Sequence, residues 1–473
     1  MIDPTTDAWA PWQPTAGDPW NRKWAAHLYR RAGFGAGREE LLEAEKRGHE
    51  ATLDLLLKGS PEAAEALRTL LDVGIVAAAR EDGGDELRGW WLYCMLHGQH
   101  PLREKLTLFW HNHFATSIAK VRGTDLMFRQ NRTLREHALG KFGPFLQAMS
   151  RDPAMLLWLD SNSNVKGKPN ENYAREVMEL FSLGVGNYTE KDIREAARAF
   201  TGWHTDGKAF RFKPDLHDGG TKTFFGKTGD WDGGDVVKIL LEQPAAAKFL
   251  VGKLYSYFVS EVAPPNGLLD PLADSFRKSD YDVAGLMRTM LSSKWFFSEN
   301  AFRKRIKSPV EFVLGAAKAV YLEDPDSPLQ QSLLTPRVTA MAQTLFAPPN
   351  VKGWPGGRAW LNTATMLERN NFASALACGS VWNPPDVPFA VAEGVPPPKV
   401  FDPARVIDEE KASTPEEIVR VLLEVHLPGG IRPEAQQKLV AFVGDGKPQG
   451  RALQDRIREA VHAVLTMPEY QLC

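Results

Sequence analysis

The polar residues with the strongest catalytic character lie on one predicted helix. Glu171, Arg175 and Glu179 follow one another at four-residue intervals, and Asn172 with Glu176 forms a second pair at the same spacing. Residues four apart share a face of an α-helix. In a site, Glu171 or Glu176 would be a general base and Arg175 would bind an anionic group. The same spacing is typical of a solvent-facing ladder of ion pairs, so a catalytic and a structural interpretation both stay open.

His111 and His113 form the most reactive-looking pair of side chains. Residues two apart on a regular helix point about 200° away from each other, so these rings would share a metal ion only where the helix ends or distorts. His217 and Asp218 lie at the tip of a predicted hairpin that would fold over the same region. Together the four side chains would suit zinc, iron or manganese. The alternative is a hydrogen-bonded core histidine at position 113 and a half-exposed one at position 111.

Four residues are candidates for binding a substrate: Asn170, Asn172, Lys222 and Trp354. Asn170 is also a natural N-cap for the helix that follows it, which gives it a structural role in either case. Trp354 and Trp360 are flanked by glycines and would form an exposed platform for stacking on sugars, although core packing explains most aromatic residues.

Asp160 begins a spacing that is similar to a calcium-binding loop. Asp160, Asn162, Asn164 and Glu171 occupy the first, third, fifth and twelfth positions of the EF-hand pattern. The sixth position is Val165, where the sharp turn of that loop requires glycine. A polar loop leading into a capped helix is therefore the preferred interpretation.

Composition excludes several classes of protein. The 473 residues include 57 Lys and Arg against 59 Asp and Glu, a net charge of −2, so the basic surface of a nucleic-acid-binding protein is missing. The short basic run at 303–307 is interpreted as a solvated helix end rather than an anion site. Three cysteines give no disulfide framework. The sequence also lacks the nucleophile elbow, P-loop and zincin motifs of common enzymes.

No stretch is long and apolar enough to predict a membrane span. The first twenty residues show no basic segment followed by an apolar one, so no export signal is predicted and a cytoplasmic location is expected for the chain as written.

Most of the chain has the helical periodicity of about 3.6 residues. Between Glu86 and Phe114 the apolar residues fall on one face of a helix, and Thr189 with Asp192 predicts a capping box at the start of another. The exception lies near 208–226, where aromatic residues alternate with charged ones and predict a β-hairpin.

We therefore predict a mainly α fold, a large helical domain with one β-hairpin insertion. The main domain is expected over 1–381. A Pro-rich crossing at 382–400 leads to a C-terminal helical segment over 401–473, packed on the main domain.

Several ordered motifs resemble one known family. They lie at 27–35 (HLYRRAGFG), 103–116 (REKLTLFWHNHFAT), 168–184 (KPNENYAREVMELFSLG), 217–226 (HDGGTKTFFG), 307–311 (KSPVE) and 346–355 (FAPPNVKGWP). Together they closely resemble the bacterial family named domain of unknown function 1800, over nearly the whole chain. The resemblance implies a mostly helical protein that is often exported and often encoded beside a sulfatase-like family numbered 1501. The chain departs from that pattern by lacking the signal.

Three functions stay open at this point. The first is an enzyme, in which the His, Glu, Asn and Arg cluster performs hydrolysis with the assistance of a divalent metal. The second is a non-catalytic binding or assembly protein that acts with the sulfatase-like partner and uses the same cluster as a structural network. The third is a carbohydrate-binding protein.

Overall fold

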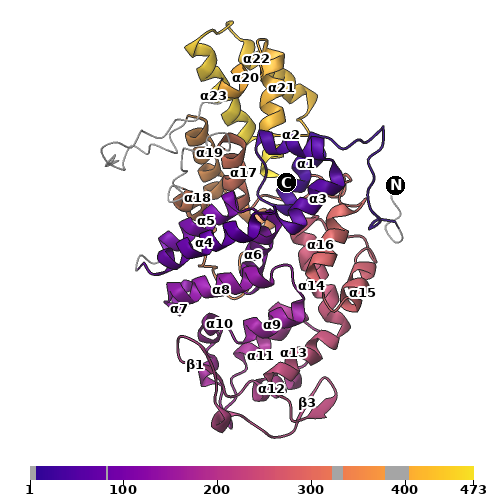
Figure 1. The fold of residues 1–473 in the computed structure, drawn as a ribbon, viewed down its shortest axis with the longest axis vertical. Coiled ribbons are helices and arrows are strands. Elements are labelled where there is room, and N and C mark those ends of the chain that lie inside the picture. Colours follow the sequence, from indigo (N-terminus) through magenta and orange to yellow (C-terminus); the bar gives the residue numbers. More distant parts are fainter. Residues whose placement is uncertain (1–6, 81–83, 322–333, 379–403) are drawn as a thin grey trace.

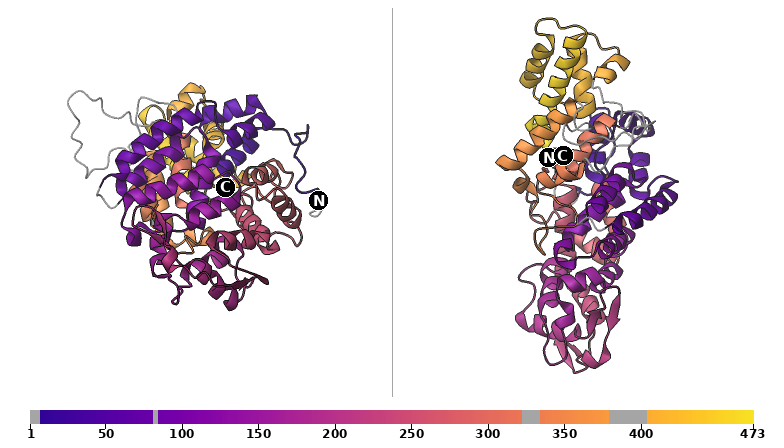
Figure 2. Two further views of the ribbon diagram at one scale, coloured as in Figure 1. Left: turned by 60° about the horizontal axis from the view of Figure 1, so that its bottom comes forward. Right: turned by 90° about the vertical axis from the view of Figure 1, so that its left-hand side faces the viewer.

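The computed structural model describes residues 7–80, 84–321, 334–378 and 404–473. The molecule is elongated, with the C-terminal helices at one end and the short strands at the other (Figures 1 and 2). The predicted mainly α fold is confirmed. The predicted Pro-rich crossing at 382–400 lies outside the described residues.

The first part of the chain forms helices, of which α1, α3, α5 and α8 contact α6. Their bounds are α1 (Arg22–Ala32), α2 (Arg38–Arg47), α3 (His49–Lys58), α4 (Ala63–Ala78), α5 (Asp85–His97), α6 (Pro101–His113), α7 (Ile118–Val121) and α8 (Thr124–His137). The segment from Glu86 to Phe114 is thus two helices rather than one. Pro101 has no N–H to donate and begins α6, and the ring of His100 accepts a hydrogen bond from Arg103 N–H at 3.4 Å.

The next part contains the signature stretch. Its elements are α9 (Phe142–Ser150), α10 (Pro153–Trp158), the 3₁₀-helix η1 (Ser161–Ser163), α11 (Asn172–Glu176), the π-helix η2 (Val177–Ser182) and α12 (Glu190–Ala199). The predicted capping box of α12 is confirmed. Thr189 Oγ1 accepts from Asp192 N–H at 3.2 Å, and the Asp192 carboxylate accepts from Thr189 N–H at 3.0 Å.

The predicted hairpin is two short hairpins. Strand β1 (Trp203–Thr205) pairs with β2 (Phe210–Phe212), and β3 (Lys222–Phe224) pairs with β4 (Lys227–Gly229), each pair antiparallel. Between them, Pro214 begins the 3₁₀-helix η3 (Pro214–Leu216). Strand β3 packs on α12 instead of on β2, because Glu195 of that helix accepts from Thr223 N–H at 2.9 Å.

The remaining elements complete both ends of the molecule. They are α13 (Gly233–Glu242), α14 (Pro244–Phe258), α15 (Asp270–Lys278), α16 (Val283–Ser292), α17 (Pro309–Tyr321), α18 (Leu334–Ala340), the 3₁₀-helix η5 (Gly357–Trp360), α19 (Thr363–Ala377), α20 (Ala404–Glu409), α21 (Pro415–His426), α22 (Pro433–Gly444), α23 (Arg451–Thr466) and the 3₁₀-helix η7 (Pro468–Gln471). Helix α23 packs along α19, and α21 contacts α17. Among the described helices, none combines the length and apolar character needed to cross a lipid bilayer.

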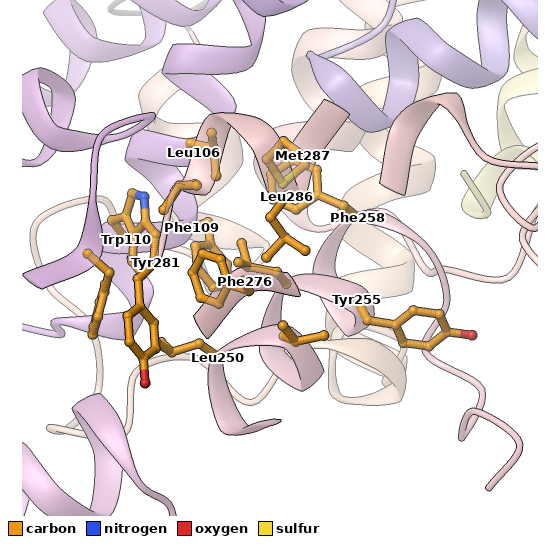
Figure 3. Close-up of a cluster of buried hydrophobic side chains, with 14 of the residues drawn as sticks. Leu106, Phe109, Trp110, Leu250, Tyr255, Phe258, Phe276, Tyr281, Leu286 and Met287 are labelled. Atoms are coloured by element: carbon orange, nitrogen blue, oxygen red, sulfur yellow. The ribbon is translucent and has the colours of Figure 1, made fainter. Parts of the chain in front are cut away.

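Two hydrophobic clusters form the core, and α6 contributes to both. Figure 3 shows Leu106, Phe109 and Trp110 of α6 beside Leu250 of α14 and Phe276 of α15 in the first cluster. On the same helix, Leu108 belongs to the second cluster, which is built mainly from α5, α17, α19, α21 and α23. Most residues of α6 are buried, including the charged Glu104 and Lys105, so α6 is a central element of the fold.

Candidate functional site

At the C-terminal end of α6, His111 and Asn112 bind the loop that precedes η5. Phe346 N–H donates to His111 Nε2 at 3.2 Å. Asn112 Oδ1 accepts from Trp354 N–H at 2.7 Å, and Asn112 Nδ2 donates to the Trp354 carbonyl at 3.3 Å. Gly353 has a φ of +76°, and a Cβ there would lie 2.1 Å from Asn112 Oδ1. Only glycine therefore fits at this close approach.

The next residue, His113, binds the π-helix η2. His113 Nε2 donates to the Phe181 carbonyl at 3.1 Å, and Lys253 Nζ donates to the neighbouring Leu180 carbonyl at 3.4 Å. Carbonyls at the end of a helix lack partners within it and need side-chain donors. We call His111, Asn112 and His113, together with these backbone partners, the motif junction.

Both histidines of the motif junction are neutral. Burial lowers the pKa of His111 to about 3, and burial, reinforced by the charge of Lys253, lowers the pKa of His113 well below its ordinary value. Because His111 accepts at Nε2, its proton lies on Nδ1. His113 donates at Nε2, which leaves its buried Nδ1 without a hydrogen-bond partner in the described part of the chain.

The structure does not bring the candidate metal ligands together. His111 lies against Trp91 in the second core cluster, whereas His113 lies against Phe142 in the first. Within the described residues, no group of three or more His, Cys, Asp and Glu side chains is placed to hold a metal ion. A divalent metal therefore stays a prediction.

His217 and Asp218 attach the loop before β3 to α12. His217 Nδ1 lies 2.8 Å from the Thr201 carbonyl and donates to it. The Asp218 carboxylate accepts from Arg198 Nε at 2.8 Å, and this guanidinium lowers the pKa of Asp218 to about 2. Lys222, the substrate-binding candidate on β3, is buried, and its Nζ lies 3.4 Å from Asp230 Oδ1.

The carboxylates of the signature helix divide into paired and unpaired groups. Arg175 pairs with Glu171 at 3.1 Å and with Glu190 at 2.9 Å. Glu179 accepts from Tyr188 Oη at 2.9 Å instead of pairing with Arg175, because η2 begins at residue 177 and changes the helical register. The ladder inferred from the spacing is therefore present only in part.

Glu176 differs from its neighbours. It is half-buried, and its carboxylate forms no hydrogen bond or ion pair with any described residue. Burial raises the pKa of this carboxyl, and the nearby Glu179 raises it further. A carboxyl with a raised pKa and free oxygens has the properties of a general acid or base.

The expected substrate-binding residues have separate environments. Asn170 Oδ1 accepts from the N–H of Asn172, the first residue of α11, at 2.9 Å, but the N-cap position of this helix is Glu171 and not Asn170 as predicted. Asn172 itself is exposed. Trp354 and Trp360 each retain 6% exposure, so neither ring offers the open face that stacking on a sugar requires.

The amides of the calcium-like loop bind backbone groups. Asn162 bonds to Thr205 through both its oxygen and its nitrogen, at 2.8 and 3.0 Å. Asn164 donates to the Ala197 carbonyl at 3.0 Å and accepts from Asn170 N–H at 2.9 Å. These side chains connect η1 to β1, α12 and the start of α11, in agreement with a structural loop.

The basic run at 303–307 is not a solvated helix end, and the interpretation from the sequence was wrong. Arg305 and Lys307 each retain 4% exposure. Arg305 pairs at 3.0 Å with Glu311, which Lys105 also binds. The motif KSPVE at 307–311 was the sequence signal that could have indicated this burial, because its lysine and its glutamate both lie in the same buried region. Burial could not be predicted from the run itself.

Comparisons with known proteins identify a family but no activity. The family model described as "Protein of unknown function (DUF1800)" matches residues 27–472. No curated protein and no solved structure matches the chain.

Proposed function

The chain belongs to the DUF1800 family of unknown function, and on the geometry of its motifs we propose that it is a non-catalytic binding or assembly protein. The observation that carries this proposal is the motif junction. His111, Asn112 and His113 direct their polar groups to backbone atoms of two distant segments. In this proposal the polar signature stabilises the shape that a partner recognises, and the sulfatase-like neighbour implied by the family resemblance is the proposed partner.

The test measures the thermal stability and the partner binding of the same variant. The variant Asn112→Ala removes both hydrogen bonds to Trp354, so it should lower the melting temperature and weaken binding to the purified sulfatase-like protein in the same preparation. Asn300→Ala is the matched control, because Asn300 is exposed and its side chain forms no hydrogen bond with a described residue. Complete absence of binding by the wild-type chain would refute the proposed partner.

A second function, acid–base catalysis at Glu176, is favoured by one specific observation. Its free carboxylate has a raised pKa and lies near Glu179, which in turn holds the hydroxyl of Tyr188. Such a pair of carboxyls with different environments is a common acid–base arrangement. In this alternative, the chain hydrolyses a substrate whose anionic group binds near Lys352, whose positive charge opposes the raised pKa of Glu176.

One variant distinguishes between the two proposed functions. Glu176→Gln preserves shape and removes the titrating group, so the melting temperature should stay unchanged. Wild-type and variant chains are compared for hydrolysis of p-nitrophenyl esters, phosphates, sulfates and glycosides. Turnover by the wild type that disappears in folded Glu176→Gln would establish catalysis and overturn the non-catalytic proposal.

A further inference from the structure

A small cavity of about 30 Å³ lies between α1, α17, α21 and η7. Its lining includes two cations, one carboxylate and three other side chains with polar or sulfur atoms: Arg30, Lys307, Glu311, His426, Tyr470 and Cys473. These residues come from distant parts of the chain, and three of them, Arg30, Lys307 and Glu311, belong to motifs of the family signature, at 27–35 and 307–311.

The carboxylate in this lining is already neutralised. Glu311 is bound by Lys105 and, at 3.0 Å, by Arg305, and its other oxygen accepts from Ser308 N–H at 2.7 Å. Arg305 also lies 3.7 Å from Glu261. Arg305 and Lys105 are thus the direct partners of the two glutamates, while the charge of Glu311 also acts at longer range on Arg31, Lys307 and Arg369.

Four cations of the region remain without an ion-pair partner in the described part of the chain. Arg30 and Lys307 line the cavity, and neither side chain forms a hydrogen bond or ion pair with a described residue. Arg31 donates to the Ala301 carbonyl at 2.7 Å, but its Nε and Nη1 have no partner. Arg369 donates only to uncharged oxygens. Buried cations are destabilising unless nearby negative charge offsets them. Glu311 and Cys473 act on these cations at longer range, but the cations outnumber them, so the remaining excess of positive charge calls for an anion.

Two lining residues are nine-tenths buried or more and have unused polar groups. Lys307 retains 4% exposure, and its Nζ lies 3.5 Å from the centroid of the Tyr470 ring, which positions the ammonium by a cation–π contact. His426 retains 3% exposure, and its Nδ1 has no hydrogen-bond partner among the described residues. Burial lowers the pKa of Lys307 well below its ordinary value, Arg30 lowers it further, and Cys473 opposes the shift. A bound anion would restore the charge of this lysine.

The backbone provides the space for this cavity. Gly35 has a φ of +95°, and a Cβ at that position would lie 3.4 Å from the Cα of Gly315. Both glycines line the cavity, so α1 and α17 approach each other closely without side chains filling the gap. A space of about 15 Å³ holds one water, so a cavity of about 30 Å³ accepts about two atoms of that size, such as the two oxygens of a carboxylate, and excludes large ligands.

We propose that this cavity binds a small monovalent anion, a carboxylate group or an inorganic ion of similar size, between Arg30 and Lys307 with His426 beside it. The inference goes beyond the proposed partner binding and does not depend on it. Arginine and lysine both form charge-assisted hydrogen bonds to such anions, and these bonds are strongest where water is excluded.

The test is isothermal titration calorimetry on the full chain with sodium acetate, sodium chloride and sodium phosphate as separate titrants, at constant ionic strength set with the bulky MOPS anion. Saturable binding of acetate or chloride is expected. Tighter binding of acetate would indicate that the natural ligand is a carboxylate group, and tighter binding of chloride would indicate an inorganic ion. Lys307→Met should weaken this binding about tenfold to a hundredfold, the loss of one charge-assisted hydrogen bond. Arg30→Met is the second variant, because Arg30 is half-buried and its replacement is less disruptive to folding.

Lys304→Met is the matched control, since Lys304 lies in the same segment but is exposed. It should bind the anion as the wild type does. Absence of saturable binding by the wild-type chain would overturn the proposal, and so would equal weakening in the Lys304 and Lys307 variants. Phosphate binding tighter than that of both acetate and chloride would contradict the limit on size and charge.

Discussion

Replacing Asn112 by alanine removes the strongest contact of the motif junction. The side chain accepts from Trp354 N–H at 2.7 Å and donates to the Trp354 carbonyl at 3.3 Å. Trp354 retains only 6% exposure, so water does not readily replace these partners. A buried backbone group that loses its partner costs about 1–3 kcal/mol, and the longer bond contributes less than the shorter one. We expect the change to destabilise this contact by about 2–4 kcal/mol.

Hydrogen exchange is the assay that resolves this loss. If the 473 residues unfold as one unit, the entropy of unfolding is about 1 kcal/mol per kelvin, so the melting temperature falls by only about 2–4 °C. Local opening responds more strongly, because each 1.4 kcal/mol changes an opening constant about tenfold. Amides of peptides over 346–355 should exchange about thirtyfold to several-hundredfold faster than in the wild type.

Two further variants make the result decisive. Asn112→Asp retains the acceptor for Trp354 N–H and loses the donor, so exchange over 346–355 should lie between wild type and Asn112→Ala. The exposed control Asn300→Ala should exchange like the wild type in these peptides. Unchanged exchange over 346–355 in a folded Asn112→Ala chain would refute the role assigned to the motif junction.

Three other predictions concern local strain, protonation and capping. Gly353→Ala should destabilise the chain by more than about 1 kcal/mol, because an unfavourable φ alone costs about that much and the new Cβ would also lie 2.1 Å from Asn112 Oδ1. Urea unfolding measures this loss of stability. A variant as stable as the wild type would contradict the close packing of Gly353 on Asn112. His111 has a folded pKa of about 3 against about 6.5 when unfolded, so below pH 6.5 the unfolded chain takes up a proton that the folded chain does not. The stabilising contribution of neutral His111 is thus complete above pH 6.5 and falls by up to about 1.4 kcal/mol per pH unit between pH 6.5 and pH 3. The variant His111→Gln should remove this slope when the free energy of unfolding is measured in urea at several pH values. An imidazole of His111 that titrates near pH 6.5 in an NMR experiment would contradict the prediction. Asp232→Ala should cost about 1 kcal/mol, since Asp232 caps α13 through Gly234 N–H at 2.7 Å, and Asp232→Asn should recover most of that loss in the same unfolding assay.

The candidate site shows where local pattern and tertiary contact separate. The spacing of Glu171 and Arg175 predicts the ion pair that the structure contains at 3.1 Å. The same spacing fails for Arg175 and Glu179, because the chain changes from α- to π-helix at residue 177. Nothing in the four-residue interval signals that change. In the structure, His113 and Lys253 bind carbonyls of η2 from helices far away in the sequence.

Buried charge shows the same division. The run at 303–307 has the composition of a solvated segment, and five consecutive residues contain no information on what covers them. Lys307 is buried because Tyr470, more than 150 positions later, returns to pack on its ammonium. The cation therefore becomes a candidate ligand group only after the two ends of the chain have met.

The sequence by itself determined the mainly α fold and the capping box at Thr189. These features depend on hydrogen bonds and hydrophobic periodicity within a few residues, so local spacing is sufficient to predict them. Only the tertiary structure decided that His111 and His113 contact different core clusters and that Lys307 is buried at a cavity. The partners and protonation of a buried polar group are set by contacts between distant segments, which the spacing of neighbouring residues does not encode.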